Sequence, residues 1–365
     1  MNNNPDFENS WEVLALDIGG GTQDLLLWSP NRSMENSVQC VLPSPTVMVA
    51  RRIAEATRQS RPIFLSGSLM GGGASSQAIR RHLKSGLPVY AEPGPAMTLH
   101  DNLEYILEAG VILTETAPAE AVKIHLSDIQ EEALTALLES FELSRPGHYL
   151  VAVQDHGYSP VESNRKFRFQ HWERFLQGRK PLETLLYREV PDYLTRMRAL
   201  QGTWPQARVM DTGAAAILGA LEDDRNPGRA EELLVVNIGN EHTLGAWLVE
   251  GALKGIYEHH TTLLDREKLL DHLDRFVAGA ISNEAVYADR GHGCLNTAPR
   301  TGRLPRLLVT GPRRHLLAGT RAEMAAPYGN MMLSGCFGLL RAYRGPRRDP
   351  IKGQDLTPAN KSEFY

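Results

Sequence analysis

The sequence of 365 residues has only three cysteines, Cys40, Cys294 and Cys336, and they lie far apart. An odd number of widely spaced cysteines argues against a disulfide framework and against the closely spaced ligands of zinc-knuckle or iron–sulfur motifs. No apolar run is long enough to cross a bilayer. The first residues, MNNNPDFENSW, lack the basic and apolar regions of a signal peptide. These absences favour a cytoplasmic protein with no membrane partner.

The chain also lacks an excess of positive charge. Its formal net charge is −4, which gives no general attraction to nucleic acid, so nucleic acid is not an expected partner. Apolar residues make up 42% and charged residues 22%, as in ordinary globular proteins. A chain of this length can form two domains that each bury a core.

A glycine-rich turn near the N-terminus is the first candidate site. In VLALDIGGGTQDLLLW (13–28), two apolar strands flank Gly19 to Thr22, with Asp17 before the turn and Asp24 after it. Consecutive glycines can present several backbone N–H groups to an anion, and Asp17 could hold Mg²⁺. The alternative is a glycine-containing hairpin with an acid at its mouth. The spacing matches neither a P-loop nor a G-x-G-x-x-G motif.

The same pattern occurs a second time in LVVNIGNEHTLGAWL (234–248). Asn237 takes the place of Asp17, Ile238 that of Ile18, and Gly239 that of Gly19. An internal repeat of this kind indicates that the fold contains the same structural unit twice. The repeat, together with strands that alternate with helices, predicts an α/β protein with two similar units.

We expect a first domain over residues 1–209 and a second over 210–343. Residues 156–205 are basic, aromatic and polar, which is typical of loops and helices inserted at a cleft edge or boundary. The second domain ends in a helix of small residues, NMMLSGCFGLLRAY, expected to pack back on the first domain. The segment 344–365 is charged and proline-rich and is expected to be a flexible tail.

Five segments in order resemble the actin, sugar-kinase and heat-shock-chaperone ATPase superfamily. They are LALDIGGGTQDLLL, VMDTGAAAILGALED, LVVNIGNEHTLGAWL, LLVTGPRRHLL and YGNMMLSGCFGLLRA. The resemblance implies two ribonuclease-H-like domains, as in actin-like ATPases, with a nucleotide in the cleft between them and closure by hinge motion.

The same resemblance implies roles for individual residues. Asp17 would be a catalytic carboxylate on the side of a bound Mg²⁺, and Asp211 would be the acid that orients water or polarises an attacking hydroxyl. The ligand would be ATP or ADP. The nucleotide-binding positions implied are Gly19, Gly20, Gly21 and Thr22 in the first turn, Gly239 and Asn240 in the second, and Thr310, Gly311 and Pro312 in the adenosine segment.

Three departures from the superfamily pattern weaken the case for turnover. Asn237 stands where hydrolytic members usually have an acid, Glu241 would repel phosphate, and Pro312 begins an unusual adenosine turn. The leading hypothesis is a Mg-dependent ATP-binding protein that hydrolyses ATP slowly or transfers phosphate to an unidentified small metabolite. The alternative is a non-catalytic module that senses nucleotide or binds a protein partner.

Histidines in glycine-flanked loops form a separate candidate site. Such loops let a side chain reach a metal, an anion or a proton. For any single one of these histidines a hydrogen bond to the backbone is the favoured interpretation, but we expect at least one of them to be functional. None has the spacing of a recognised zinc motif. A third hypothesis is therefore an enzyme that binds a metal or anion through the Asp155/His156 and Asp289/His292 loops without nucleotide. The candidates for a substrate or second site are Asp155, His156, His242, Arg290 and His292.

A narrower resemblance rests on LALDIGGGTQD, VAVQDHG, DRGHG and APYGNMMLSGCFGLL. These segments are similar to an uncharacterised prokaryotic family, some members of which carry a label relating them to pyruvate formate-lyase activation. A radical enzyme of that kind needs a clustered motif of three cysteines, and this chain has none. The label therefore implies a chemistry that the sequence does not support.

Overall fold

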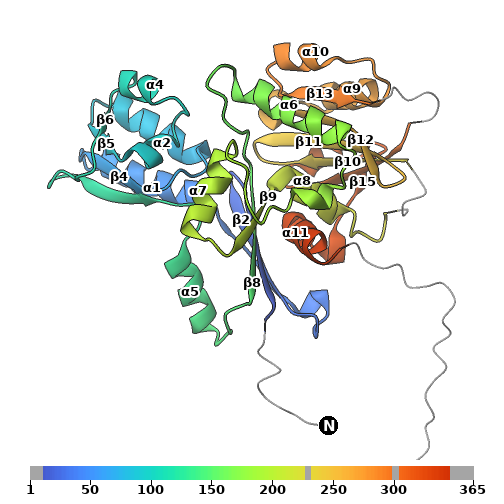
Figure 1. The fold of residues 1–365 in the computed structure, drawn as a ribbon, viewed down its shortest axis with the longest axis horizontal. Coiled ribbons are helices and arrows are strands. Elements are labelled where there is room, and N and C mark those ends of the chain that lie inside the picture. The colour runs from blue at the N-terminus through green and yellow to red at the C-terminus, as the bar shows by residue number, and fades with distance from the viewer. Residues whose placement is uncertain (1–10, 227–231, 298–303, 346–365) are drawn as a thin grey trace, which may run out of the picture.

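The computed structural model describes residues 11–226, 232–297 and 304–345. The expected tail lies outside these residues from position 346 onward. Within the described ranges the strands form three sheets of five, six and four strands. Figure 1 shows the four-stranded sheet at one end of the molecule and the six-stranded sheet at the other.

The first sheet has the order β3-β2-β1-β8-β9. β1 (Val13–Ile18), β2 (Thr22–Trp28) and β3 (Val38–Pro43) form an antiparallel meander. β8 (His148–Val153) and β9 (Ala207–Asp211) continue the sheet parallel to β1. Nearly every residue of β1 is buried, as its apolar sequence predicts for a strand covered on both faces.

The second sheet repeats this plan. β10, β11 and β12 form a meander, and β14 and β15 lie parallel to β10 on its other side. β13 adds one antiparallel strand beside β12. The bounds are β10 (Glu232–Ile238), β11 (His242–Val249), β12 (Ala252–His260), β13 (Gly293–Asn296), β14 (Arg306–Thr310) and β15 (Glu323–Met324). The prediction of an α/β fold with two similar units is confirmed.

The four-stranded sheet is an additional layer inserted between β3 and β8. Its order is β6-β5-β4-β7 and all its strands are parallel. It has its own apolar core, which includes Ile63, Leu65 and Ile124. Its strands are β4 (Ile63–Gly67), β5 (Val89–Ala91), β6 (Val111–Leu113) and β7 (Val122–Leu126), and its helices are α1 (Pro45–Arg58), α2 (Gly73–Lys84), α3 (Pro93–Ala96) and α4 (Leu103–Glu108).

Two helices of small residues join the repeated units. α8 (Thr212–Ala220) and α11 (Ser334–Arg344) pack closely on each other. A Cβ at Gly219 would overlap the carbonyl of Ser334, and a Cβ at Gly338 would overlap the carbonyl of Ala215. The two backbones touch, so only glycine fits at these two positions.

The segment 156–205 does not stand apart from the rest of the molecule. Its main helix, α6 (Asn164–Gln177), contacts β12 and β13 of the second sheet, although it follows β8 of the first (Figure 1). Phe169 and Trp172 are buried in the core that also contains α8 and α11. The other helices are α5 (Glu131–Ser140), α7 (Thr195–Thr203), α9 (Arg266–Val277) and α10 (Asn283–Ala288).

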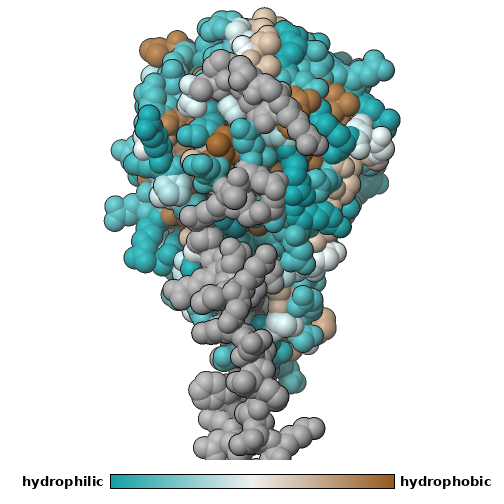
Figure 2. All heavy atoms as spheres, turned by 90° about the vertical axis from the view of Figure 1, so that its right-hand side faces the viewer, coloured by the Kyte–Doolittle hydropathy of each residue, from teal (hydrophilic) through white to brown (hydrophobic). Residues whose placement is uncertain are grey.

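Among the described residues, no helix combines the length and the apolarity that crossing a bilayer requires. The face shown in Figure 2 is mostly hydrophilic, and its apolar residues gather only in small separate groups. Isolated apolar residues of this kind are normal on protein surfaces.

Candidate functional site

The two repeated turns have the same backbone hydrogen bond and lie against each other. Gly19 N–H donates to Thr22 O at 2.9 Å, and Gly239 N–H donates to His242 O at 2.9 Å. A Cβ at Gly20 would lie 2.9 Å from the side chain of Glu241, so the first turn closely faces the second. In the described part of the chain, four turn amides have no protein acceptor: those of Gly20, Gly21, Asn240 and Glu241.

Two acids lie side by side behind the first turn. Asp17 on β1 is directly opposite Asp24 on β2 in the antiparallel register. Burial raises the pKa of Asp17 to about 7, and burial together with the charge of Asp17 raises the pKa of Asp24 to about 8. Asp24 Oδ1 is buried without a hydrogen-bond partner among the described residues. This pair of carboxylates is therefore a place where a cation would relieve unfavourable charge.

The predicted catalytic acid Asp211 begins α8. Its Oδ1 accepts hydrogen bonds from the N–H groups of Gly213 (3.0 Å) and Ala214 (3.1 Å), as an N-cap residue does. Its Oδ2 accepts from Arg168 Nη1 at 2.8 Å. The next residue, Thr212, donates its hydroxyl to Asp17 Oδ1 at 2.5 Å and so connects α8 to the first turn. Both oxygens of Asp211 are thus engaged, and its catalytic role stays a prediction.

Arg168 of α6 connects the two units through buried charges. Its Nε donates to Glu258 Oε2 on β12 at 2.6 Å, while its Nη1 contacts Asp211 of the first unit. Gln154 Nε2 donates to the other oxygen of Glu258 at 3.0 Å. Burial raises the pKa of Glu258, although the Arg168 charge opposes this shift. With both carboxylates ionised, the group carries one net negative charge.

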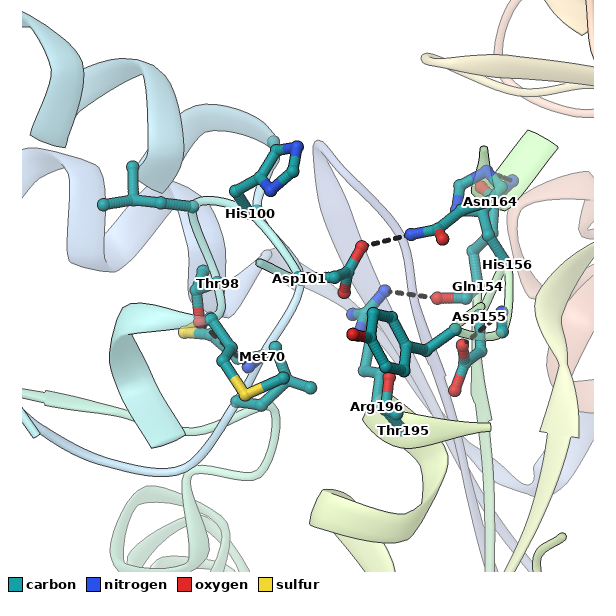
Figure 3. A pocket seen from close by; sticks show the side chains of 18 of the residues that line it. Met70, Thr98, His100, Asp101, Gln154, Asp155, His156, Asn164, Thr195 and Arg196 are labelled. Atoms are coloured by element: carbon teal, nitrogen blue, oxygen red, sulfur yellow. Dashed lines mark hydrogen bonds between the residues drawn. The ribbon is translucent and has the colours of Figure 1, made fainter. Parts of the chain in front are cut away.

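A cavity of about 800 Å³ lies beside the first turn, between the four-stranded sheet and the loop after β8. In Figure 3, Met70, Thr98 and Asp101 lie on one side, and Gln154, Asp155, His156 and Arg196 lie on the other. Asn164 donates to Asp101 across this gap. One end of the cavity is lined by Gly19, Gly20, Thr212, Glu241 and His242. The cavity therefore adjoins the phosphate-loop candidates.

The predicted adenosine segment does not line this cavity. Thr310 is buried and its hydroxyl lies 2.7 Å from the hydroxyl of Ser334. Gly311 has φ +96°, and a Cβ there would overlap the carbonyl of Ile238. Pro312 follows, and Arg313 N–H donates to Ile238 O at 3.0 Å. The segment therefore packs against the end of β10, close to the second turn.

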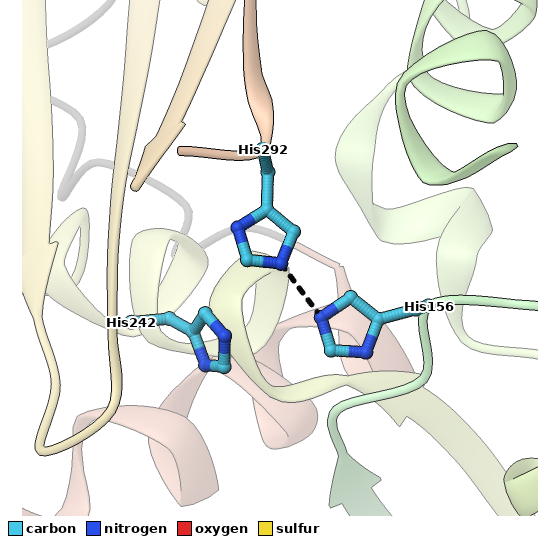
Figure 4. A group of neighbouring side chains, drawn as sticks. All are labelled: His156, His242 and His292. Carbon is cyan, nitrogen blue, oxygen red and sulfur yellow. Dashed lines mark hydrogen bonds between the residues drawn. The ribbon is translucent and has the colours of Figure 1, made fainter. Parts of the chain in front are cut away.

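Three of the predicted histidines come together where the two units meet. His156 follows β8, His242 begins β11 and His292 precedes β13, and their rings converge in Figure 4. One ligand nitrogen from each can be chosen so that all lie within 4.8 Å of one another. His156 Nε2 and His292 Nε2 are 2.9 Å apart. Both nitrogens of His242 and Nδ1 of His292 are buried without a partner among the described residues.

Burial keeps these three imidazoles neutral. It lowers the pKa of His242 to about 3 and lowers the pKa of His156 and His292 below the usual range, and the neighbouring histidines lower all three further. Neutral imidazole is the form that binds a metal ion.

The other two candidates of this set lie differently. Asp155 accepts backbone hydrogen bonds from Gly157 (2.8 Å) and Met197 (3.0 Å), so its carboxylate holds the loop in shape. Arg290 is exposed and has φ +67°.

Several residues of the site are not among those predicted from the sequence. Asp24 is one of them, and it lies opposite Asp17 in the antiparallel hairpin. Its position could have been predicted from the sequence, by pairing the two strands outward from the glycine turn. Arg168 and Glu258 lie on segments whose contact depends on the tertiary fold, so no local pattern indicates their pairing.

A family model described as "Putative pyruvate format-lyase activating enzyme (DUF1786)" matches residues 70–316. The chain belongs to this family. The predicted narrower resemblance is thereby confirmed, but the cysteines do not suit iron–sulfur chemistry. Cys40 lies on β3, Cys294 on β13 and Cys336 on α11, and burial raises the pKa of Cys294 to about 12. No cluster of thiolate ligands can form from three cysteines placed in this way.

No protein with a curated description matches the sequence significantly. Several solved structures align along most of the chain at low identity. The "PilM-PilN type IV pilus biogenesis complex" aligns at 13% identity and a TM-score of 0.39, covering 91% of this chain and 98% of that one. A Bacteroides thetaiotaomicron protein of actin-like ATPase fold and unknown function aligns at 8% identity and a TM-score of 0.38, covering 92% of this chain and 98% of that one. The ethanolamine utilization protein EutJ from Carboxydothermus hydrogenoformans aligns at 9% identity and a TM-score of 0.32, covering 90% of this chain and 88% of that one.

Proposed function

We propose that the chain binds a magnesium–nucleotide complex, ATP or ADP, between the two repeated turns. The observation that carries this proposal is the set of four acceptor-free turn amides, those of Gly20, Gly21, Asn240 and Glu241, gathered where the two turns meet. Clustered backbone N–H groups in glycine-rich turns bind phosphate oxygens. The adenosine would lie toward Thr310, Gly311 and Pro312, beyond the second turn.

The acids behind the first turn support the cation in this proposal. Asp24 is buried and Asp17 is partly buried, the pKa values of both are raised, and the Thr212 hydroxyl donates to Asp17. Bound Mg²⁺ would offset the charge of both the carboxylates and the phosphates. Asp17 would hold the ion and Thr212 would fix the carboxylate rotamer.

For turnover, the cavity beside Gly19 and Gly20 would hold the acceptor, either water or a small metabolite. Asp211 does not line this cavity but precedes Thr212, which does, and from there it would act as the acid that polarises the acceptor, with its carboxylate positioned by Arg168. Asn237 and Glu241 favour slow rather than rapid hydrolysis, because the second turn lacks the usual acid and carries a charge that repels phosphate. A nucleotide sensor without turnover is the alternative within the same site.

Calorimetry on the full chain with ATP and ADP, with and without Mg²⁺, tests the proposal. We expect saturable binding that Mg²⁺ strengthens. The Asp17→Asn variant should bind Mg²⁺–ATP at least about tenfold more weakly, a loss of about 1.4 kcal/mol of binding free energy. Asp265→Asn is the matched control, because Asp265 is an exposed N-cap of α9. Absence of binding up to millimolar nucleotide, or equal affinity in Asp17→Asn, would contradict the proposal.

Turnover is tested separately by phosphate release at saturating ATP. Asp211→Asn retains an N-cap residue, so α8 should stay folded. We expect kcat to fall at least about 100-fold with little change in affinity. Unchanged hydrolysis in this variant would remove Asp211 from the mechanism.

A further inference from the structure

We propose that His156, His242 and His292 bind a divalent first-row transition metal ion of the zinc(II) type where the two units meet. This site is distinct from the magnesium position at Asp17. Three observations support this site: the ligand set, the unpartnered nitrogens and a second histidine group that serves as a contrast.

The ligand set suits a catalytic type of metal centre. Three imidazoles that leave one position open are a typical arrangement for catalytic zinc, whereas Mg²⁺ prefers oxygen ligands. Metal–nitrogen bonds of about 2.0–2.1 Å place tetrahedral ligand atoms about 3.3 Å apart. His156 Nε2 and His292 Nε2 are 2.9 Å apart and would have to separate by a few tenths of an ångström, and a ligand nitrogen of His242 lies within 4.8 Å of this pair.

Unpartnered nitrogens distinguish this group from an ordinary packing of histidines. Buried polar atoms in native proteins nearly always have a hydrogen-bond partner, and exceptions call for an explanation such as an ion. His242 has two such nitrogens and His292 has one, within the described residues. His292 is only 1% exposed. A metal ion would satisfy one of the two nitrogens of His242, whereas His292 would bind through Nε2, the atom that faces His156, and its Nδ1 would keep no partner among the described residues.

The second histidine group provides the contrast. His259, His272 and Asp289 also lie within ligand distance of one another. There, however, His259 Nε2 bonds Asp289 Oδ2 at 3.0 Å, His272 Nδ1 bonds the Tyr257 hydroxyl at 2.9 Å, and Lys268 pairs with Asp289. Hydrogen bonds and an ion pair therefore account for the second group, whereas the first has the His156–His292 and Gln154–His156 hydrogen bonds and still leaves three ring nitrogens without a partner among the described residues.

Charges of both signs lie near the three histidines, because Arg168 acts on all three and is itself paired with two carboxylates. Gln154 Nε2 lies 3.4 Å from His156 Nε2 and bonds Glu258, and the group of Arg168, Asp211 and Glu258 carries one net negative charge. A divalent ion held by neutral imidazoles would be partly compensated by this charge. His156 and His242 line the cavity, so the open position of the ion would face it. A cavity ligand with an oxygen or nitrogen donor could then bind the metal directly.

Metal analysis of the full chain, purified with a histidine-free tag and without chelators, tests the proposal. We expect about one equivalent of a first-row transition metal per chain by elemental analysis. After removal of the metal, titration with Co²⁺ should give visible bands of a four- or five-coordinate site with nitrogen ligands. Addition of Zn²⁺ should displace Co²⁺ and abolish the bands.

Variants then assign the site. His242→Gln and His292→Gln should each lower the Co²⁺ affinity at least about 100-fold. His272→Gln, in the second group, should leave it unchanged. His292 is deeply buried, so if His292→Gln does not fold, His242→Gln decides, because His242 lies at the cavity wall.

Three outcomes would overturn the proposal: binding weaker than about 100 μM in the wild-type chain, unchanged binding in a folded His242→Gln variant, or loss of binding in His272→Gln alone. The test uses protein free of nucleotide and Mg²⁺. Its result is therefore independent of nucleotide binding at the turns.

Discussion

The two repeated turns share a backbone and differ in almost every side chain. Each closes with a Gly N–H bonded to a carbonyl three residues later, at 2.9 Å in both. Behind the first turn, Asp17 faces Asp24, while behind the second, Asn237 faces Leu244. The first turn consists of glycines and threonine, whereas the second carries Asn240, Glu241 and His242.

This difference shows how one supersecondary unit can take two roles. The glycines of the first turn expose backbone N–H groups that can bind a phosphate, and the two acids behind the turn can bind the cation that accompanies it. The second turn has no acid pair behind it but presents side chains, and His242 extends toward the other unit to meet His156. The repeat preserved the framework, and the turn residues diverged in chemistry.

The largest expected effect on stability comes from filling the space at two glycines, Gly335 on α11 and Gly213 on α8, which lie against residues of the first and the second hairpin. A Cβ at Gly335 would overlap the carboxylate of Asp17, whereas a Cβ at Gly213 would lie 2.6 Å from the flexible end of Leu244. We expect Gly335→Ala to lower the free energy of unfolding by about 3 kcal/mol, and Gly213→Ala by about 1 kcal/mol.

Urea unfolding of both variants measures this difference. Gly202→Ala is the control, because a Cβ there meets nothing within 4 Å in α7. It should be neutral or stabilising by up to about 1 kcal/mol. Equal losses at Gly335 and Gly213 would show that the two turns are supported alike.

The next effect is a pH dependence confined to the first turn. The folded-state pKa values of Asp17 and Asp24, about 7 and about 8, lie above the unfolded value of 3.8. The folded state therefore binds more protons at this pair between these values, so the contribution of the pair to stability is fully present below about pH 4 and is lost as the pH rises toward 8.

Asp24→Asn should reduce this loss by about 1 to 3 kcal/mol, because it removes one of two interacting charges. The measurement is urea unfolding from pH 4 to pH 8 in the presence of a chelator. Asp265→Asn should retain the wild-type pH profile. A pH profile of Asp24→Asn that is identical to wild type would show that the pair does not titrate in this range.

The smallest effect concerns the charge on the second turn. Glu241→Gln makes this turn electrically similar to the first and removes repulsion of phosphate next to Gly20. We expect the affinity for Mg²⁺–ATP to rise about two- to fivefold, since Glu241 is exposed and its charge is screened. Calorimetry measures it, with Glu284→Gln on the exposed face of α10 as the control. A lower affinity in Glu241→Gln would mean that Glu241 binds the metal instead.

Local patterns in the sequence were sufficient to predict the repeated hairpins. The apolar strands around residues 17–24 and 237–244 alternate with polar turns, and the same order appears twice, so their pairing and the α/β class follow. The four-stranded sheet was not separated from the first domain. β5 and β6 have three residues each, and such short parallel strands carry no periodicity that assigns them to one sheet or another.

The candidate site was predictable only in part. Asp17 and the turns depend on local sequence, and the glycine-flanked loops indicated that His156 and His292 could reach a ligand. That these two meet His242, and that Arg168 joins Asp211 to Glu258, depends on three segments that only the tertiary fold brings together. Asp155 has the same glycine-flanked context as His156, yet its oxygens accept backbone hydrogen bonds.

The close crossing of α8 and α11 also has a consequence for the order of folding. α8 is made before the second sheet and α11 after it, so the contact between their glycines forms only when nearly all described residues are available. During synthesis, the apolar side of α8, with Ala215 and Ile217, must wait for its partner. Until α11 emerges from the ribosome, this apolar surface of the nascent chain lacks its helix partner and is open to aggregation or to capture by a chaperone.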